Sequence, residues 1–275
     1  MTVLSSLIDI YHDPMFLKLP VASLALGIAG FLLFSLPWTL LAIRDPAWAR
    51  PYRIQDKPFD ALRYLPETIR RMTVNTLVVA GLLVLAWPLL RLSGIHDGPR
   101  PAWYVFVWQI VFFLFLDDFL YYWMHRWMHE NKWLLRHVHA VHHQVRNPCA
   151  LAGNHFHWAE LAMTSGLVLV GPILVGAHVE VVYLWVLLRQ LEAADGHTGY
   201  HFPWDPLHRL PFYEGAAFHD FHHARFQGNY AGFLPLWDRI FGTYVPQYLH
   251  WRQRHIGEGG LVPPPPGEAK ATPGR

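Results

Sequence analysis

The chain has 275 residues and is apolar, rich in aromatic side chains and poor in charge. Apolar residues make up 53% of it and charged residues 15%, against roughly 25% charged residues in soluble domains. This composition excludes disorder over most of the chain and disfavours a water-soluble globule. The net charge of +2 is too small to indicate nucleic acid as a partner. The single Cys149 excludes an intramolecular disulfide and a thiolate-cluster metal site.

Three apolar stretches are predicted to cross a membrane: residues 20–43, 72–92 and 101–124. The first carries no charge and is long enough to span a bilayer. It lacks the basic n-region and the small-residue cleavage site of a signal peptide, so we expect it to remain as a span.

A fourth apolar stretch, residues 159–191, is too long for one span and is interrupted by Gly171, Pro172 and Gly176. If it crossed the membrane once, the histidines before and after it would lie on opposite faces. We therefore expect a re-entrant or tight helical hairpin that turns near Gly171–Gly176. Halves of about 15 residues would reach only ~22 Å, which is short of the ~30 Å hydrocarbon core.

Basic residues predict the orientation of these segments. Seven Arg and Lys residues lie in 44–71, whereas Lys18 is the one basic residue before the first span. The positive-inside rule places 44–71 in the cytoplasm, the N-terminus outside, and the histidine-rich region that starts at residue 125 inside. The expected fold is an all-α integral membrane helical bundle, with three spans, the hairpin and a cytoplasmic His-rich helical cap.

We expect one domain over residues 1–257 and a disordered Pro-rich tail over 258–275. The bundle would be a multi-pass protein of a bacterial inner membrane or of the endoplasmic reticulum, with its active site on the cytoplasmic side.

Ten of the 19 histidines fall into four clusters. Within a cluster the spacing is i,i+3 or i,i+4, which on a helix places the imidazoles on one face. Two such side chains can chelate one metal ion. One pair is weak evidence, but four clusters, two of them with the same H-x-x-H-H pattern, are a specific signal. The predicted ligands are His125 and His129; His139, His142 and His143; His197 and His201; and His219, His222 and His223. His137 lies on a different helix face, and we expect it not to be a ligand.

The number of imidazoles indicates which metal they hold. A structural zinc takes four ligands, so ten are too many for it, but they suit two ions of five or six coordination. A redox-active metal would explain why the chain has so many imidazole ligands, and we expect two iron ions. A nearly all-histidine site leaves the positive charge of the metals uncancelled. We hypothesise that the centre is therefore oxidising enough to attack an unactivated C–H bond.

A ligating imidazole is usually oriented through its other ring nitrogen. The candidates for this role are close to the clusters in sequence: Asp118, His157, Glu160, Asp195 and Asp220. Asp118 precedes His125 by seven residues, two helical turns back on the same face. Each of the five could equally be a helix cap or a surface charge.

The order of the motifs resembles that of the membrane-bound fatty acid hydroxylase and sterol desaturase superfamily. The matching strings are HRWMH, HAVHH, GNHFHWAE, DGHTGYHFPW, HDFHHARFQGNYAG and WDRIFGT. Together with PYRIQ at 51–55 they look most like the sterol carbon-4 methyl oxidases, and the resemblance covers roughly residues 50–245.

This resemblance implies a di-iron monooxygenase that uses O2 as co-substrate to oxidise a C–H bond of a lipid, with the ten clustered histidines as ligands. It further implies electrons from NAD(P)H, delivered by a redox partner such as a b-type cytochrome or a ferredoxin with its reductase. The substrate that the subgroup implies is a sterol methyl group.

Two alternatives stay open. A fatty acyl chain, a ceramide or a carotenoid would be hydroxylated or desaturated by the same superfamily. A non-enzymatic metal-binding or metal-transporting membrane protein is more distant. Transport predicts ionisable residues along the spans, whereas these spans carry no charge through most of their length.

Overall fold

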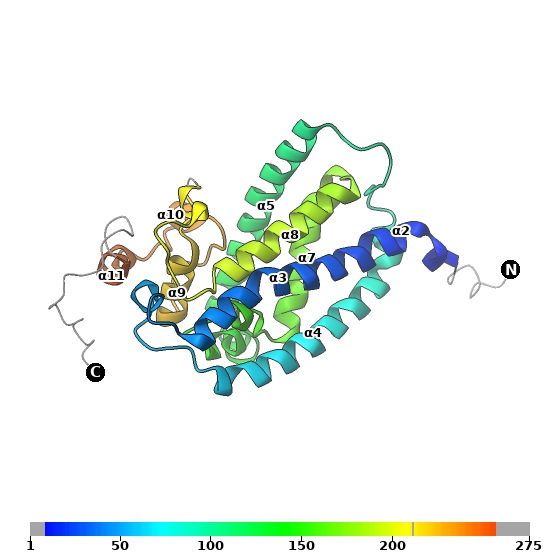
Figure 1. The fold of residues 1–275 in the computed structure, drawn as a ribbon. Coiled ribbons are helices and arrows are strands. Elements are labelled where there is room, and N and C mark those ends of the chain that lie inside the picture. The colour runs from blue at the N-terminus through cyan, green and yellow to red at the C-terminus, as the bar shows by residue number, and fades with distance from the viewer. Residues whose placement is uncertain (1–8, 211, 257–275) are drawn as a thin grey trace.

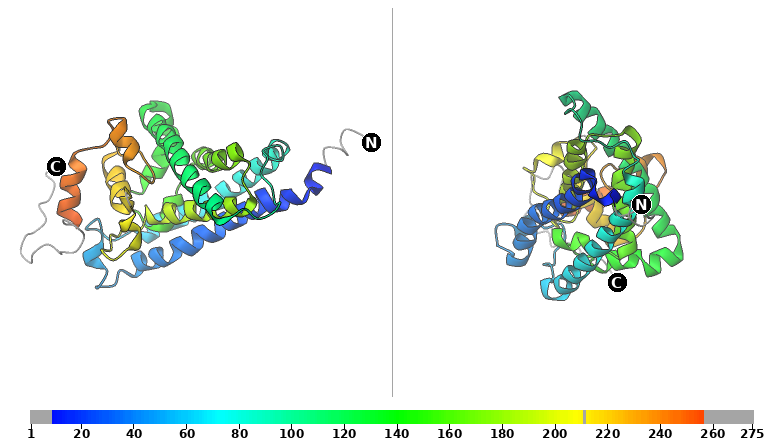
Figure 2. Two further views of the ribbon diagram at one scale, coloured as in Figure 1. Left: turned by 90° about the horizontal axis from the view of Figure 1, so that it is seen from above. Right: turned by 90° about the vertical axis from the view of Figure 1, so that its right-hand side faces the viewer.

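The computed structural model describes residues 9–210 and 212–256, and every regular element in this part of the chain is a helix. Five long helices form an elongated bundle: α3 (Ala22–Arg44), α4 (Ala61–Leu90), α5 (Trp103–Glu130), α7 (Trp158–Val175) and α8 (Val179–Asp195). Three shorter helices, α9 (Gly215–Arg225), α10 (Leu236–Ile240) and α11 (Gln247–Ile256), lie at the end far from the N-terminus (Figures 1 and 2). The predicted all-α fold is confirmed for these residues. The predicted tail, 258–275, lies outside them.

Four helical segments are long and apolar enough to cross a membrane: Pro14–Arg44, Ala61–Leu90, Trp103–Glu130 and Trp158–Val175. The chain is therefore a multi-pass membrane protein. The first segment joins α2 (Pro14–Phe16) through a π-helical turn, Leu17–Val21, to α3. It begins at Pro14 because the Asp13 side chain accepts a hydrogen bond from the Met15 N–H at 2.9 Å and proline suits the first helical position.

The second span is longer than its apolar stretch predicted. α4 begins at Ala61, where the Asp60 side chain accepts a hydrogen bond from the Arg63 N–H at 3.1 Å. Its first turns are charged, and Glu67 pairs with Arg70 at 2.7 Å and with Arg71 at 2.8 Å. These i,i+3 and i,i+4 pairs support a helix that hydrophobicity alone does not reveal.

The predicted hairpin is confirmed. α7 ends at Val175, Gly176 takes a left-handed φ of 56°, and His178 caps α8 by accepting the Glu180 N–H at 3.2 Å. The turn packs on the link between α4 and α5, since a Cβ at Gly176 would lie 3.1 Å from the Gly94 carbonyl oxygen. The two helices of 18 and 17 residues are longer than predicted. The hairpin nevertheless returns to the side from which it started.

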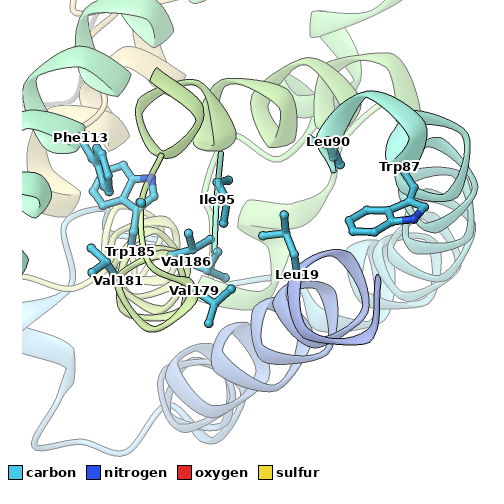
Figure 3. Packing of buried hydrophobic residues seen from close by; sticks show 11 residues of the cluster. Leu19, Trp87, Leu90, Ile95, Phe113, Val179, Val181, Trp185 and Val186 are labelled. Carbon is cyan, nitrogen blue, oxygen red and sulfur yellow. The ribbon is translucent and has the colours of Figure 1, made fainter. Parts of the chain in front are cut away.

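The bundle core lies between α8 and its neighbours. Trp185 of α8 packs on Phe113 of α5, with ring centroids 6.0 Å apart (Figure 3). At the other end of this core, the Trp87 indole N–H donates to the Ile10 carbonyl at 2.8 Å. Close approach of α5 and α7 depends on Gly171, where a Cβ would lie 2.6 Å from the Phe113 ring.

The segment between α3 and α4 lies at the same end of the bundle as α9. The Ile54 N–H donates to the Gly199 carbonyl at 3.0 Å, and the Gln55 amide donates to Asp220 at 2.7 Å. The basic segment that was predicted to be cytoplasmic is therefore on the side of the histidine clusters.

We expect Gly171→Val to destabilise the bundle, whereas Gly166→Val on the same helix should not, because nothing lies within 4 Å of a Cβ at Gly166. Overpacking against Phe113 should cost about 1–3 kcal/mol of unfolding free energy. Both variants add the same residue to α7, so helix propensity cancels between them. Unfolding of the purified proteins in a detergent titration measures the difference. Equal midpoints would show that the α5–α7 contact tolerates a side chain.

Candidate metal centre

Nine of the ten predicted ligands come together at one end of the bundle. They come from the end of α5, the 3₁₀ helix η4 (His139–Gln144), the turn after α8, and α9. All nine side chains are buried. They form two groups, in each of which the potential ligand atoms lie within 4.8 Å of one another: a first group of His125, His129, His139, His143 and His222, and a second group of His142, His197, His219 and His223.

Each H-x-x-H-H motif contributes to both groups. In the motif on η4, the first and last histidines join the first group and His142 joins the second. In the motif on α9 the pattern is reversed, and His222 alone joins the first group. The groups are therefore adjacent, with the rings of His143 and His223 4.7 Å apart between centroids.

The Nε2 atoms of each group point at one another. In the first group the Nε2 atom of His139 lies 2.8 Å from that of His129 and 2.9 Å from that of His143. In the second, the His219 and His197 Nε2 atoms are 2.9 Å apart. Two imidazoles on one metal, each at a metal–nitrogen distance of about 2.1 Å and roughly at right angles, place their nitrogens about 3 Å apart. The spacing fits one ion in each group.

The opposite ring nitrogens show which form the imidazoles take. The Nδ1 atoms of three rings donate to backbone carbonyls: His125 to Tyr230 at 2.7 Å, His197 to Ala193 at 2.9 Å and His222 to Gly228 at 2.8 Å. A carbonyl oxygen only accepts, so the proton sits on Nδ1 and Nε2 presents a lone pair. Lone pairs that face one another at about 3 Å with no proton between them repel. The donor set therefore fits a cation at the centre of each group.

Burial keeps these rings neutral. Desolvation, together with the neighbouring imidazoles, lowers the pKa of His142, His143 and His219 well below its ordinary value. It lowers the pKa of His197 and His222 to about 4. Neutral imidazole is the form that binds a metal, so the site is prepared for one at neutral pH.

Of the predicted orienting groups, Glu160 contacts a ring of the two groups. Its Oε1 atom accepts from His139 Nδ1 at 2.7 Å, and both side chains are buried. A carboxylate at this position fixes the tautomer of the imidazole and makes its Nε2 a stronger donor to a metal. Glu160 lies in the first turn of α7, so the membrane hairpin is tied directly to the first group.

Asp118 does not contact His125. Two helical turns separate them by about 10 Å along α5, which is too far for a hydrogen bond. The Asp118 carboxylate instead accepts three backbone N–H groups, those of Gly232, Phe233 and Leu234, at 2.7–3.0 Å. It anchors the loop whose Tyr230 carbonyl accepts the hydrogen bond from His125 Nδ1.

The other three predicted orienting groups are bonded elsewhere. His157 Nδ1 accepts the Ala159 N–H at 3.2 Å and caps α7, which is one of the alternatives left open above. Asp195 accepts from the Tyr213 hydroxyl. Asp220 accepts from Gln55 at 2.7 Å, and burial raises its pKa to about 7.

His201 lies outside both groups. Its i,i+4 spacing from His197 would bring the rings together on a helix, but α8 ends at Asp195 and the following turn has Gly199 at φ 72°. The backbone of His201 instead turns toward the segment after α3, where its N–H donates to the Tyr52 carbonyl at 2.8 Å. The structure thus brings together nine of the ten residues predicted.

Sequence reasoning missed the residues that enclose the groups. The Phe156 ring stacks on His142 at 4.4 Å, and Phe226 packs on His143 at 4.5 Å with a left-handed φ of 65°. Gly153 lies against His197, whose ring a Cβ would meet at 2.7 Å. Together they exclude water from the imidazoles. The signal in the sequence is an aromatic residue close to a histidine: Phe156 lies between two histidines in HFHW, and Phe226 follows His223 by three residues in HHARF.

Known proteins are similar to this chain over most of its length. A family model described as fatty acid hydroxylase matches residues 110–243, which include all nine clustered histidines. The very-long-chain aldehyde decarbonylase GL1-11 of Oryza sativa subsp. indica is 39% identical over 217 residues, 78% of this chain and 80% of that protein. The chain belongs to the fatty acid hydroxylase family. Another relative, methylsterol monooxygenase 1-3 of Arabidopsis thaliana, is 34% identical over 82% of this chain and 79% of its own length.

A second plant sterol enzyme, methylsterol monooxygenase 2-2 of Arabidopsis thaliana, is 35% identical over 81% of this chain and 84% of its own. No solved structure matches. The resemblance predicted from the motifs is confirmed. As a member of the family, the chain is a membrane oxidoreductase.

We expect His197→Ala to remove about one of two metal ions per chain, because it takes one of four donors from the second group. His201→Ala should leave both ions in place. Metal content of the purified variants, measured by elemental analysis, separates the two. If His201→Ala lost an ion and His197→Ala did not, the grouping of the rings would be wrong.

We expect acid to release the metal only well below about pH 6.5, the pKa of a histidine in an unfolded chain. In an unfolded chain a histidine takes up its proton near pH 6.5, whereas His197 and His222 in the folded chain do so at about 4. Native stability is therefore greatest above pH 6.5 and falls as the pH drops toward 4, since the unfolded state binds more protons. Metal content after gel filtration should be unchanged at about pH 5.5 and lost near pH 4. Half-release at pH 6.5 would indicate solvent-exposed rings.

Proposed function

We propose that this chain is a di-iron enzyme that uses O2 to oxidise a C–H bond of a membrane lipid, with a sterol methyl group as substrate. The observation that carries the proposal is the pair of adjacent, buried imidazole groups at the end of four candidate spans. Two bound iron ions would supply the activation of O2 and the one-electron chemistry that side chains lack. The non-enzymatic alternative gives no role to a pair of sites so close together.

The side chains of the protein would bind the two ions, orient the imidazole rings and exclude water from the site. Five and four imidazoles would hold the two ions, and neither set completes six coordination, so positions remain for O2 or substrate. Glu160 orients His139, and backbone carbonyls orient three other rings. Phe156 and Phe226 cover the rings and keep water from the reacting centre.

The donor set favours iron over zinc. A closed zinc site takes four ligands, and the first group alone offers five. Imidazole binds several transition metals, and among them iron is the one that we expect to support O2-dependent oxidation in this family.

The cytoplasm is the proposed side of the active site. The basic segment 44–71 lies at the end of the bundle that holds the histidine groups, since Ile54 and Gln55 form hydrogen bonds with Gly199 and Asp220. Positive charge marks cytoplasmic loops, so the site would receive electrons there, from NAD(P)H through a b-type cytochrome or a ferredoxin with its reductase.

The sterol assignment follows the methylsterol monooxygenases among the relatives. A second candidate substrate is a long-chain aldehyde, because the decarbonylase relative is 39% identical. A fatty acyl chain, a ceramide or a carotenoid remains a third class, hydroxylated or desaturated.

Cells that express the intact chain under ¹⁸O2 should accumulate a lipid that carries ¹⁸O, and cells with His143→Ala should accumulate its precursor instead. His137→Ala is the control, since His137 is exposed and lies outside both groups. We expect His143→Ala to lose at least about 100-fold of the product, because it removes a direct metal ligand. Mass spectrometry of extracted lipids identifies the precursor and therefore the substrate class.

Protein that holds zinc without iron and consumes no O2 would instead support a non-enzymatic metal-binding protein. An ¹⁸O-labelled acyl lipid in place of a sterol would keep the enzyme class and replace the substrate.

A further inference from the structure

A cavity of about 180 Å³ lies within the membrane bundle, between α3, α4, α7 and α8. Its wall is mainly aliphatic and is completed at one end by the 3₁₀ helix η5 (Ala150–Asn154). Ile28, which is 40% exposed, belongs to the wall, so the cavity opens on the outer surface of the bundle, where lipid would surround it. Its volume accommodates part of a lipid, and the remainder would extend through this opening.

Polar side chains interrupt this wall. Asn154 and Gln190 both line the cavity, and among the residues that the structure describes neither side-chain amide has a hydrogen-bond partner in the chain. The hydroxyl of Ser23, a third lining residue, is also buried without a partner within the same described ranges. Polar groups inside a membrane bundle normally pair with one another, and those that do not are available to a ligand.

The Asn154 end of the cavity is the end next to the metal centre. Gly153, one residue before, touches the His197 ring, and Phe156, two residues after, stacks on His142. Both of these histidines belong to the second group. At the opposite end, the wall is formed by Ser23 near the start of α3 and Leu83 near the end of α4.

We propose that this cavity is the substrate site and that it takes a lipid whose single hydroxyl lies close to the carbon that is oxidised, as in a 3-hydroxysterol. The hydroxyl would bond to the Asn154 amide, and the apolar body would lie along Leu24 and Leu83, away from the metals. A lipid attacked far from its polar group would place that group at the Ser23 end of the cavity and leave Asn154, the amide next to the histidine groups, unpaired. This inference rests on the proposed function.

Binding of a fluorescent 3-hydroxysterol to the iron-loaded protein in lipid nanodiscs tests the cavity, read as energy transfer from tryptophan. Gly27 lines the cavity, and a Cβ there would meet Val186 at 3.6 Å and Gln190 at 3.9 Å, which are ordinary contacts. Gly27→Leu should therefore fill the cavity and weaken binding at least about tenfold. Gly81→Leu is the matched control, because Gly81 is exposed on α4 with nothing within 4 Å of a Cβ.

Asn154→Leu tests the orientation. It should weaken binding of the hydroxysterol about tenfold and leave binding of the 3-deoxy analogue, measured by competition, unchanged. Metal content and unfolding midpoints equal to those of the unchanged protein show that the variants are folded. Equal weakening of both sterols would overturn the role of Asn154, and Gly27→Leu binding as tightly as Gly81→Leu would overturn the cavity as the site.

These failures are separable from a failure of the proposed function. If Gly27→Leu still bound and oxidised sterol, oxidation would stand and the cavity assignment would fall. If the unchanged protein bound sterol in the cavity but never oxidised it when supplied with iron, O2 and a reductant, the proposed function would fall and the site would stand.

Discussion

The structure depends on an arrangement that is unfavourable by itself: nine buried imidazoles whose Nε2 atoms converge on two points. Where Nδ1 carries the proton on both rings, as in His125 and His139, two Nε2 lone pairs face each other at 3.1 Å. Burial lowers the pKa of His197 and His222 to about 4, so protonation does not relieve this repulsion near neutral pH. A cation in each group does relieve it. The cost of assembling the rings in a metal-free chain would be offset by the metal, so that binding energy contributes directly to the folding energy of this end of the molecule.

The same constraint explains the hairpin. Histidines that precede α7 and histidines that follow α8 must reach one pocket, so the apolar chain between them has to return to the side it left. The left-handed Gly176 and the His178 cap make the turn, and Gly171 lets α7 approach Phe113. Glu160 in the first turn of α7 bonds to His139 of the first group, and His197 just after α8 belongs to the second group. The membrane core and the metal centre therefore share their positioning elements.

The sequence predicted the helical membrane fold, the hairpin and ten clustered histidines, nine of which the structure brings together, because each leaves a local, periodic signal. A spacing argument holds only while the element it assumes persists. It works for His125 and His129 within α5, and it fails for His201 because α8 has already ended. Contacts between distant segments leave no such signal. Asp118 is 114 residues from Gly232, the first of its three backbone partners, and nothing near either residue marks the pair.

Asp118 nevertheless helps to position a histidine of the first group, through the loop that it binds. Together with Asp238 it binds five consecutive backbone N–H groups, since Asp238 accepts those of Tyr230 and Ala231 at 2.8 Å and Asp118 accepts the next three. The loop fixed in this way presents the Tyr230 carbonyl to His125 Nδ1. A carboxylate placed directly on the imidazole would pull its proton strongly, as Glu160 does at His139. The Tyr230 carbonyl, in a loop whose N–H groups two buried carboxylates bind, also orients the ring but polarises it less than a carboxylate would. The first group thus combines one strongly polarised histidine, His139, with two, His125 and His222, that backbone carbonyls orient, which would leave more of the positive charge of a bound metal uncancelled.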